Sequence, residues 1–478
     1  MKTDTIAAIA TALSDSGIGI IRISGEEAVL VADSIFRTVG GKKKLGSVES
    51  HTIHYGYIAD IPAGEETDCS NWKQYIIDEV MVSVMKAPRS YTMEDIVEIN
   101  CHGGVLVMQK ILEVVLKNGA RLAQPGEFTK RAFLNGRIDL SKAEAVIDVI
   151  HSQNEFALAS SMNQLKGNLS QKIRKLREDI IYEIAFIESA LDDPEHISLE
   201  GYKEKLEEKT DTLLAEIEKL IQTADNGKLM KEGISTVIVG KPNAGKSSLL
   251  NIMVGEERAI VTDIAGTTRD VLQESIKLHG IGLNIIDTAG IRDTEDTVEK
   301  IGVERAKKFA KDADLIIYVV DSSVELDESD REIVSLLEDK KAIILLNKTD
   351  LSSVVDEKRL HSFIKDILPE YGQMVMIRTS TKDNIGMEAF ENTIKEMFFK
   401  GQLKNNNEIV ITSMRHKEAL QDSYESLKMV RKSIEDDMPE DFYSIDLMSA
   451  YAFLGTIIGE EVGEDLVNEI FSKFCMGK

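Results

Sequence analysis

The residues with the most specific chemistry in this sequence are those of Gly240–Ser248, GKPNAGKSS. They follow an apolar run, Ile234–Val239, that is typical of a buried parallel strand, and they precede Leu249–Asn251, the expected first turn of a helix. A strand, the pattern G-x-x-x-x-G-K-S and a helix together form a phosphate-binding loop. A chance glycine-rich turn is the alternative, but it would not require the flanking strand and helix. We therefore expect the chain to bind a nucleoside triphosphate.

The side chains of this loop have separate expected roles. Lys246 supplies positive charge to the β- and γ-phosphates and is a candidate catalytic residue, while the Ser247 hydroxyl binds Mg²⁺. The backbone N–H groups and the helix N-terminus surround the phosphates. The loop residues expected to contact nucleotide are Asn243, Ala244, Gly245, Lys246, Ser247 and Ser248.

Two further segments in the nucleotide-binding region are expected to act near the γ-phosphate. In the DTAG sequence after the strand Ile285-Ile286, Asp287 can bind the Mg²⁺ water shell and the Gly290 N–H can sense the γ-phosphate. Between this motif and the phosphate loop, Thr268 can give Mg²⁺ a second hydroxyl. The residues expected to contact GTP in these segments are Thr262, Asp263, Ile264, Ala265, Gly266, Thr267, Thr268, Asp287, Thr288, Ala289 and Gly290.

The base specificity is expected to come from two segments that follow apolar strands. Asn347-Lys348-Thr349-Asp350 follows the strand Ala342–Leu346, and its aspartate can accept two hydrogen bonds from guanine N1–H and the exocyclic amine, which adenine cannot donate. The segment Thr379–Lys382, which includes Ser380, is a looser match to the loop behind the guanine O6. Five motifs in register predict GTP as the nucleotide. The candidate base-binding residues are Asn347, Lys348, Asp350 and Ser380.

The hydrolysis apparatus departs from that of Ras. The position where Ras has its water-positioning glutamine is Ile291 here, so another group must orient the water. The amide oxygen of Asn243 could hold a monovalent cation between the β- and γ-phosphates, where it would replace an arginine finger, closed by backbone carbonyls of Thr262–Thr267. The alternative is that Asn243 is only a polar loop residue and that an arginine acts as the finger, with the candidates Arg258, Arg269 and Arg292.

The rest of the chain must position this nucleotide unit. The first 137 residues read as mixed α/β, with strands expected over Gly17–Ser24, Thr52–Ile58, Ile76–Lys86 and Ile96–Asn100, and a helix over Gly104–Lys117 that ends at Asn118-Gly119. Arg22 and Glu98 each alternate with apolar neighbours in these strands. By itself, that pattern favours a solvated strand face.

Helical patterns flank the nucleotide unit on both sides. Ser141-x-x-Glu144 reads as a capping box, and apolar residues recur at helical spacing from Ile173 to Leu191, before Asp192-Asp193-Pro194 ends the helix. A charged helix over about Tyr202–Thr223 follows, and near the end Val462, Leu466, Ile470 and Phe474 form one stripe. Two apolar helical segments are most simply buried against each other. We therefore expect one discontinuous helical domain with a doubly wound, Ras-like P-loop domain inserted into it.

The predicted boundaries are residues 1–137, 138–227, 228–400 and 401–478, with the nucleotide unit beginning after Asn226-Gly227. A net charge of −25 over 478 residues argues against a general basic surface for nucleic acid, but it allows a local basic patch. Three cysteines, Cys69, Cys101 and Cys475, fit a reducing compartment. No apolar run reaches the length of a membrane span, so we expect a cytoplasmic protein with no membrane contact.

Several motifs together resemble one family over the whole length of the chain, the tRNA modification GTPase family MnmE, also called TrmE. They are IRISG at Ile21–Gly25, CHGG at Cys101–Gly104, PGEFTKRAFLNGRIDL at Pro125–Leu140, the phosphate loop, DIAGTTRD, DTAGIR and the terminal Cys475-Met476-Gly477-Lys478. The N-terminal motifs and the C-x-G-K ending separate this family from other GTPases that share the nucleotide loops.

The resemblance implies a homodimer built on a folate-binding N-terminal domain similar to the glycine-cleavage aminomethyltransferase. It also implies a potassium-stimulated GTPase that forms a heterotetramer with the flavoprotein MnmG and adds an aminomethyl-type group to C5 of the wobble uridine of certain tRNAs. A tetrahydrofolate derivative, in the 5-formyl or 5,10-methylene form, supplies the carbon. Whether glycine or ammonium supplies the amine is left open.

The resemblance also assigns residues by motif. Potassium would be held by Asn243, Thr262, Ile264 and Thr267, and magnesium by Ser247 and Thr268. Glu299 matches the glutamate that orients the attacking water. The folate positions are Arg22, Glu98, Arg137 and Lys478, with lysine in place of Arg137 in some relatives. Cys475 would act near the one-carbon unit, although a frayed tail with an exposed thiol is the alternative.

Two other classes of GTPase compete with this interpretation. A ribosome-assembly GTPase of the Era or Der type would carry an RNA-binding KH-like domain or a second GTPase domain. A septin- or dynamin-like polymerising GTPase would carry a longer coiled coil or a membrane-binding patch. Neither pattern occurs in the sequence.

Overall fold

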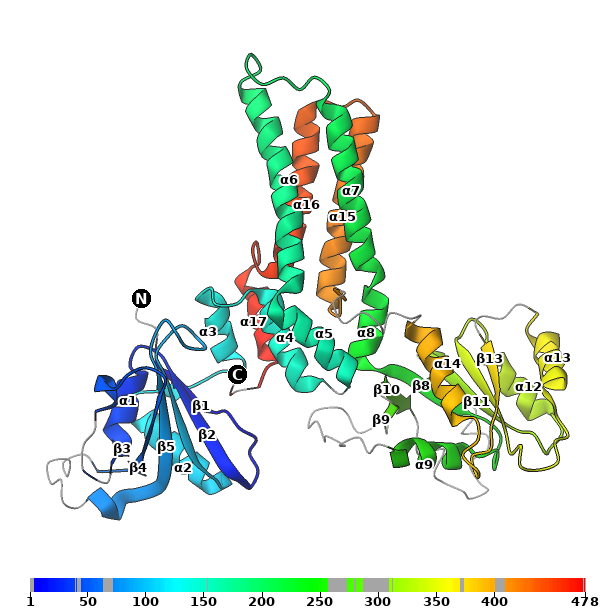
Figure 1. Cartoon of the computed structure of the whole chain (residues 1–478), viewed down its shortest axis with the longest axis horizontal. Coiled ribbons are helices and arrows are strands. Elements are labelled where there is room, and N and C mark those ends of the chain that lie inside the picture. The colour runs from blue at the N-terminus through cyan, green and yellow to red at the C-terminus, as the bar shows by residue number, and fades with distance from the viewer. Residues whose placement is uncertain are drawn as a thin grey trace. The chain divides into compact units, whose positions relative to one another are not determined.

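The computed structural model describes residues 4–38, 40, 44–62, 72–152, 154–256, 273–278, 281–286, 309–311, 313–369, 374–399, 409–475 and 477 (Figure 1). The chain divides into two compact units. The first comprises Met1–Ile147, Leu165–Asp179 and Tyr451–Lys478, and the second comprises Asp148–Gln164 and Ile180–Ala450. Within the described residues, no helix is both long enough and apolar enough to cross a membrane.

The first unit contains a seven-stranded sheet in the order β3-β4-β5-β6-β2-β1-β7. Neighbouring strands are antiparallel except β1 and β7, which are parallel. The four predicted strands are confirmed as β2, β4, β5 and β6. The strands are β1 Ile6–Ile9, β2 Ser16–Ser24, β3 Phe36–Arg37, β4 Thr52–Ala59, β5 Ile76–Met85, β6 Ile96–Gly103 and β7 Arg121–Leu122. The helices among them are α1 Ala28–Ile35, α2 Val105–Lys117 and α3 Glu127–Leu134, with short 3₁₀ turns at Leu45–Ser47 and Trp72–Tyr75.

One face of this sheet is covered by α1 and α2. Their apolar residues share a buried core with Ile21 and Ile23 of β2, and with Val97 and Ile99 of β6. Because strand side chains alternate between faces, residues between these positions lie on the opposite face. The helix α2 ends as expected, with Asn118 as its C-cap and Gly119 at a φ of +112°.

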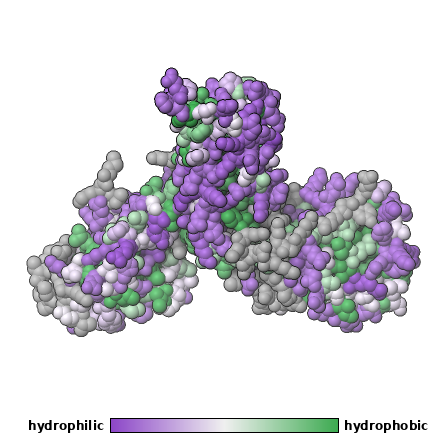
Figure 2. All heavy atoms as spheres, turned by 45° about the horizontal axis from the view of Figure 1, so that its top comes forward, coloured by the Kyte–Doolittle hydropathy of each residue, from purple (hydrophilic) through white to green (hydrophobic). Residues whose placement is uncertain are grey.

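The helical part of the chain is discontinuous in sequence, as predicted. Helices from before and after the nucleotide-binding region pack together: Arg431 of α15 lies 3.0 Å from Glu207 of α7, and Lys203 lies 2.5 Å from Asp437. The outer surface of these helices is mostly hydrophilic in the view of Figure 2. The helices are α4 Leu140–His151, α5 Glu155–Lys166, α6 Asn168–Asp192, α7 Tyr202–Gln222, α8 Ala224–Glu232, α15 Met414–Glu435, α16 Glu440–Ile458 and α17 Glu464–Ser472.

The second unit contains a six-stranded sheet in the order β13-β12-β11-β8-β10-β9, parallel except for the β9–β10 pair. In β11, Ile317 and Val319 pack with α9 and α14 on one face, while Ile316 and Tyr318 pack with α12 and α13 on the other. The sheet is therefore doubly wound, as predicted. Its elements are β8 Ile234–Val239, α9 Lys246–Glu256, β9 Gln273–Leu278, β10 Ile281–Ile286, β11 Leu315–Asp321, α12 Glu328–Ser335, β12 Ala342–Asn347, α13 Glu357–Ile367, β13 Met374–Arg378 and α14 Met387–Phe399.

Two local predictions are wrong, and a third is confirmed only in part. The capping residue of α4 is Asp139 rather than Ser141, because the Asp139 carboxylate accepts a hydrogen bond from the Lys142 N–H at 3.0 Å. The pair Asn226-Gly227 does not separate two domains, since it lies inside α8, and the chain leaves the helix at Gly233. Of the predicted stripe near the C-terminus, Phe474 is buried and Val462 and Ile470 pack partly buried against the same cluster, whereas Val467 and Phe471 take the buried positions of α17 in place of Leu466.

Candidate functional site

The phosphate loop joins β8 to α9, and its conformation depends on two glycines. Gly240 has a φ of +152° and Gly245 a φ of +109°, which L side chains rarely adopt. A Cβ on Gly240 would lie 2.4 Å from the Val319 carbonyl oxygen, and one on Gly245 would lie 2.1 Å from Nδ2 of Asn347. Asn243 has a φ of +61°, a left-handed conformation that asparagine tolerates. This backbone is the concave turn that a phosphate chain needs.

Lys246 begins α9, and its ammonium group lies inside the loop. It donates hydrogen bonds to the carbonyl oxygens of Gly240 at 2.7 Å and Lys241 at 2.8 Å. Burial lowers the pKa of Lys246 to about 8, because the charged form loses contact with water. A phosphate group placed here would stabilise the ammonium form and raise its pKa again.

Asn347 connects the phosphate loop to the expected base pocket. It ends β12, and its Nδ2 donates to the Ala244 carbonyl at 2.8 Å, while its Oδ1 accepts from the Thr381 N–H at 3.0 Å. In the same pocket, Ser380 donates to Asp350 Oδ1 at 2.9 Å. These contacts bring together three of the segments predicted from the sequence, at the carboxyl ends of parallel strands, where open α/β sheets bind ligands.

Asp321, at the end of β11, belongs to this site and was missed by the sequence analysis. The Lys348 ammonium lies 2.6 Å from its Oδ2. Burial alone would raise the pKa of Asp321, but the hydrogen bonds from Lys348 and Ser323 outweigh it, so its pKa lies below the ordinary value. The feature of the sequence that could have identified Asp321 is its position at the end of an apolar strand. Asp321 thereby fixes Lys348 beside the base-binding segment.

Several of the predicted site residues lie outside the described residues. They are Glu299, Lys478 and the two segments near the γ-phosphate, Thr262, Asp263, Ile264, Ala265, Gly266, Thr267 and Thr268, and Asp287, Thr288, Ala289 and Gly290. Ser247 lies in the first turn of α9, and Ser248 follows it at the surface.

A second candidate site lies in the first unit. Arg22 of β2 and Glu98 of β6 are register partners, and the Arg22 Nε lies 2.8 Å from the Glu98 carboxylate. The Arg22 guanidinium is 5.7 Å from the centroid of the Tyr91 ring, and the guanidinium of Arg137 is 4.7 Å from the same centroid. Arg22 and Arg137 therefore converge on Tyr91, an aromatic residue that the sequence analysis did not single out, and Glu98 joins them through its ion pair with Arg22.

Two described residues of the C-terminal tail, Cys475 and Gly477, make backbone hydrogen bonds, and Gly477 reaches this second site. Gly477 is buried, and its carbonyl oxygen accepts a hydrogen bond from Arg22 at 3.0 Å. The Gly126 N–H donates to the Cys475 carbonyl at 3.1 Å, while the Cys475 side chain is exposed. A Cβ on Gly477 would lie 2.5 Å from the Cα of Ala10, so only glycine fits at this position.

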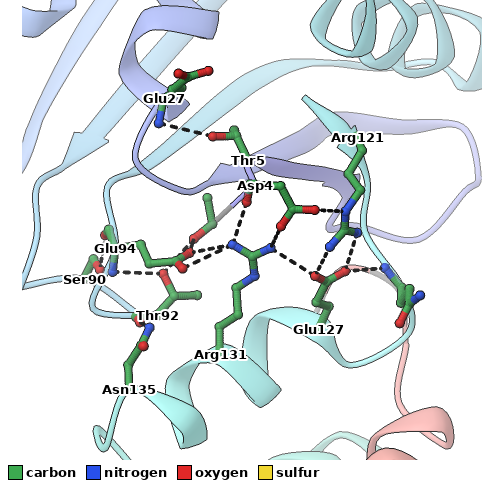
Figure 3. Close-up of polar contacts among 12 residues, drawn as sticks. Asp4, Thr5, Glu27, Ser90, Thr92, Glu94, Arg121, Glu127, Arg131 and Asn135 are labelled. Carbon is green, nitrogen blue, oxygen red and sulfur yellow. Dashed lines mark hydrogen bonds and ion pairs between the residues drawn. The ribbon is translucent and has the colours of Figure 1, made fainter. Parts of the chain in front are cut away.

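An ion-pair network supports the second site (Figure 3). Arg131 of α3 donates to Asp4 Oδ1 at 2.9 Å, to Glu127 at 3.0 Å and to Glu94 at 3.1 Å. Arg121 also binds Asp4, and it donates to Glu127 at 2.8 Å and 2.5 Å. Hydrogen bonding by Arg121 lowers the pKa of Asp4. Burial would raise the pKa of Glu127, but the hydrogen bonds from Arg121, the Gln124 N–H and Arg131 together lower it. The network ties α3 to the start of β1 and to the turn that follows Tyr91.

The doubly wound sheet, the phosphate loop and the Asn347–Asp350 segment define a P-loop GTPase. The model of the MnmE helical domain matches residues 140–475, and that of the GTP-binding protein TrmE N-terminus matches residues 5–137. The chain therefore belongs to the MnmE family of tRNA modification GTPases.

Relatives with the name "tRNA modification GTPase MnmE" match the chain over essentially its full length. The protein from Lachnoclostridium phytofermentans is 58% identical over 478 residues, which is 100% of both chains. That from Clostridioides difficile is 49% identical over 99% of both chains. That from Bacillus subtilis is 45% identical over 99% of this chain and 100% of its own.

Proposed function

We propose that this chain is a GTP hydrolase that acts in the modification of tRNA. With the flavoprotein MnmG, it adds an aminomethyl-type group to C5 of the wobble uridine, in the cytoplasm. The observation that carries this proposal is the 58% identity over the full length to a tRNA modification GTPase, in a chain that retains the phosphate loop and the Asp350–Ser380 pair.

A reconstituted reaction tests the proposal. The purified chain, MnmG and tRNA from a strain lacking both proteins are incubated with 5,10-methylenetetrahydrofolate, an amine donor and either GTP or ATP. Modified uridine is expected with GTP only, because Asp350 can pair with guanine and not with adenine. Equal product with ATP, or GTP hydrolysis without any modified uridine, would refute the proposal.

The phosphate loop also supports roles for potassium and magnesium. Asn243 is exposed and Ser247 follows Lys246 in the first turn of α9, so an amide and a hydroxyl of this loop can act as oxygen ligands. Asn243 would help to hold a potassium ion and Ser247 a magnesium ion, and these ions would supply positive charge to the phosphates of GTP. The remaining ligands proposed for the two ions are Thr262, Ile264, Thr267 and Thr268, and Glu299 orients the water.

The second site is proposed to bind the tetrahydrofolate derivative. Arg22 and Arg137 supply cationic groups that suit an anionic, aromatic ligand, since folate carries a glutamate tail and a polar pterin. Glu98 can accept hydrogen bonds from pterin N–H groups, and Tyr91 offers an aromatic surface for stacking. Lys478 is proposed to complete this set of residues, and Cys475 to act near the one-carbon unit.

A homodimer is supported by an apolar face on the N-terminal sheet. Ile53 and Tyr55 of β4 are 67% and 53% exposed, and Met81 of β5, the register partner of Tyr55, is 49% exposed. These side chains lie opposite the face that α1 and α2 cover. An isologous contact between two copies of this face would bury it. The homodimer then assembles with MnmG into the proposed heterotetramer.

A further inference from the structure

A locally basic segment occurs in this acidic chain. Residues 156–177 contain five Lys and Arg residues and no Asp or Glu, although the net charge of the chain is −25. This segment runs from α5 through a turn into the first part of α6. Three of its cations and one from α4 form a group in the first unit, named the α4–α6 basic patch: Lys142, Lys166, Arg174 and Lys175.

A buried carboxylate organises two of these cations. Asp139 is 8% exposed and caps α4, and its Oδ2 lies 3.5 Å from Lys142 Nζ and 3.6 Å from Arg174 Nη2. Its Oδ1 accepts the Ser141 hydroxyl at 2.8 Å. One carboxylate therefore holds a lysine and an arginine from different helices next to each other.

The turn between α5 and α6 brings a third cation close to this pair. Gly167 has a φ of +94°, and a Cβ there would lie 2.6 Å from Lys142 Cε and 2.9 Å from its Nζ. The Lys142 side chain thus lies across the turn, next to the residue that follows Lys166. Lys166 and Lys175 are exposed, and the Arg174 side chain is 49% exposed. Because Asp139 is buried and carries a single negative charge, the surface of the patch is positive.

The patch is connected to the second candidate site by a short, fixed stretch of chain. Arg137 comes two residues before Asp139, and its N–H donates to the Ala132 carbonyl at 2.9 Å, which closes the turn at the end of α3. Lys142 comes five residues after Arg137, so their Cα atoms are at most about 18 Å apart. A polyanion that delivers a base to the Tyr91–Arg137 site can therefore contact the patch with its neighbouring phosphates.

From this arrangement we infer that the α4–α6 basic patch binds the phosphate backbone of the RNA whose uridine is modified. The inference rests on the proposed function. Exposed lysines and an arginine suit phosphates, which need charge rather than shape, and single-stranded RNA loops present a splayed base together with accessible phosphates. The acidic remainder of the chain would then limit RNA binding to this patch.

The test compares two matched triple variants of the full chain. K166Q/R174Q/K175Q removes three charges from the patch and keeps Lys142 to neutralise Asp139. The control, K219Q/K428Q/K432Q, removes three exposed lysines from α7 and α15. Binding of total tRNA from a strain lacking this protein is measured from about 50 to about 300 mM salt, because phosphate contacts depend on salt.

The patch variant is expected to bind this tRNA about ten- to a hundred-fold more weakly at low salt. The slope of log K against log salt should fall by about 2, which corresponds to three lost phosphate contacts at about 0.7 each. The control variant should keep the wild-type slope. GTP hydrolysis should be normal in both variants, which confirms that they are folded.

Two results would overturn the inference. One is a wild-type slope in the patch variant. The other is unchanged tRNA binding with lost association with MnmG, which would assign the patch to a protein partner. If the triple variant fails to hydrolyse GTP, the salt dependence of tRNA binding is measured for the single variants K166Q and K175Q instead, because these lysines are not ion-paired with Asp139. If wild-type protein modifies no tRNA, the proposed function fails instead, and that result is independent of the patch.

Discussion

Asn347 shows how single residues join the parts of the nucleotide site. Its side-chain amide makes two hydrogen bonds: Nδ2 donates to the Ala244 carbonyl of the phosphate loop, and Oδ1 accepts from the Thr381 N–H. It is fully buried, so losing either hydrogen bond would leave an unsatisfied polar group. The neighbouring Asp350 instead presents a carboxylate that accepts the Ser380 hydroxyl.

Replacing Asp350 by Asn should change the base preference without changing the fold. The Asn side chain has the same shape, and its Oδ1 can still accept the hydrogen bond from Ser380. Its amide donates to the xanthine oxygen that replaces the guanine amine. We expect GTP affinity to fall about 100-fold or more, since each hydrogen bond to a charged group contributes about 1.5–3 kcal/mol, and xanthosine triphosphate to be preferred. Titration with both nucleotides measures this, and an unchanged GTP affinity would mean that the base pocket is elsewhere.

Replacing Asn243 by Ala should remove the preference for potassium. The wild-type protein is expected to hydrolyse GTP faster in potassium than in sodium, because the cation must have the right radius for its ligands. In the variant the two rates should become equal at the level of the wild type in sodium, with nucleotide affinity largely kept. Steady-state hydrolysis in the two salts is the measurement. Equal rates in the wild type would favour an arginine finger.

At the scale of elements, ion pairs connect the phosphate loop to a neighbouring helix. The Lys241 side chain leaves the loop and lies 2.7 Å from Asp330 and 3.0 Å from Asp327, the capping residues of α12. Asp330 is 1% exposed, and its other oxygen accepts the Tyr318 hydroxyl at 2.7 Å from the core of β11. The second residue of the loop thus anchors it to both a strand and a helix.

Replacing Lys241 by Gln should break these ion pairs. The variant leaves the buried Asp330 carboxylate without its cation, and we expect about 2 kcal/mol of lost stability, which is below the range for a fully buried pair because Tyr318 remains bound. GTP affinity should fall as well. Lys241→Arg is the matched control and should restore most of both. Urea unfolding and nucleotide titration provide the readouts, and wild-type values for Lys241→Gln would show that the ion pair does not support the loop.

Part of the arrangement of elements was predictable, since apolar runs predicted β2, β4, β5 and β6 of the first sheet and β8, β10 and β12 of the second, but not β1, β3, β7, β9 or β11. The errors have local causes. Ser141 and Glu144 match a capping box, but Asp139 lies two residues earlier and its carboxylate is the better acceptor for a free N–H. Asn226-Gly227 looks like a turn, yet α8 continues through it. Tyr91 could not be assigned to a site because its role depends on contacts with Arg22 and Arg137, which are distant in sequence.

At the scale of the whole molecule, the two candidate sites lie in different compact units. The described contacts of the tail, through Gly477 and the Cys475 carbonyl, are with the first unit. This separation predicts that GTP hydrolysis and folate-dependent chemistry can be impaired independently.

Deleting residues 475–478 should therefore leave potassium-stimulated GTP hydrolysis near normal. Folate binding should weaken, because Arg22 loses its contact with Gly477 and Lys478 is removed, and tRNA modification should be abolished. Fluorescence titration with 5-formyltetrahydrofolate and a hydrolysis assay on the same preparation separate the two effects. Full modification activity in the shortened protein would refute the role of the tail.

Mass spectrometry of tRNA nucleosides tests the central proposal most directly. In a strain that lacks this chain, the wobble uridine should lose its aminomethyl-type group at C5. Expression of the wild-type chain should restore the modified nucleoside, and expression of the Lys246→Ala variant, which cannot hold the phosphates, should not. The same nucleoside profile with and without the chain would contradict the account.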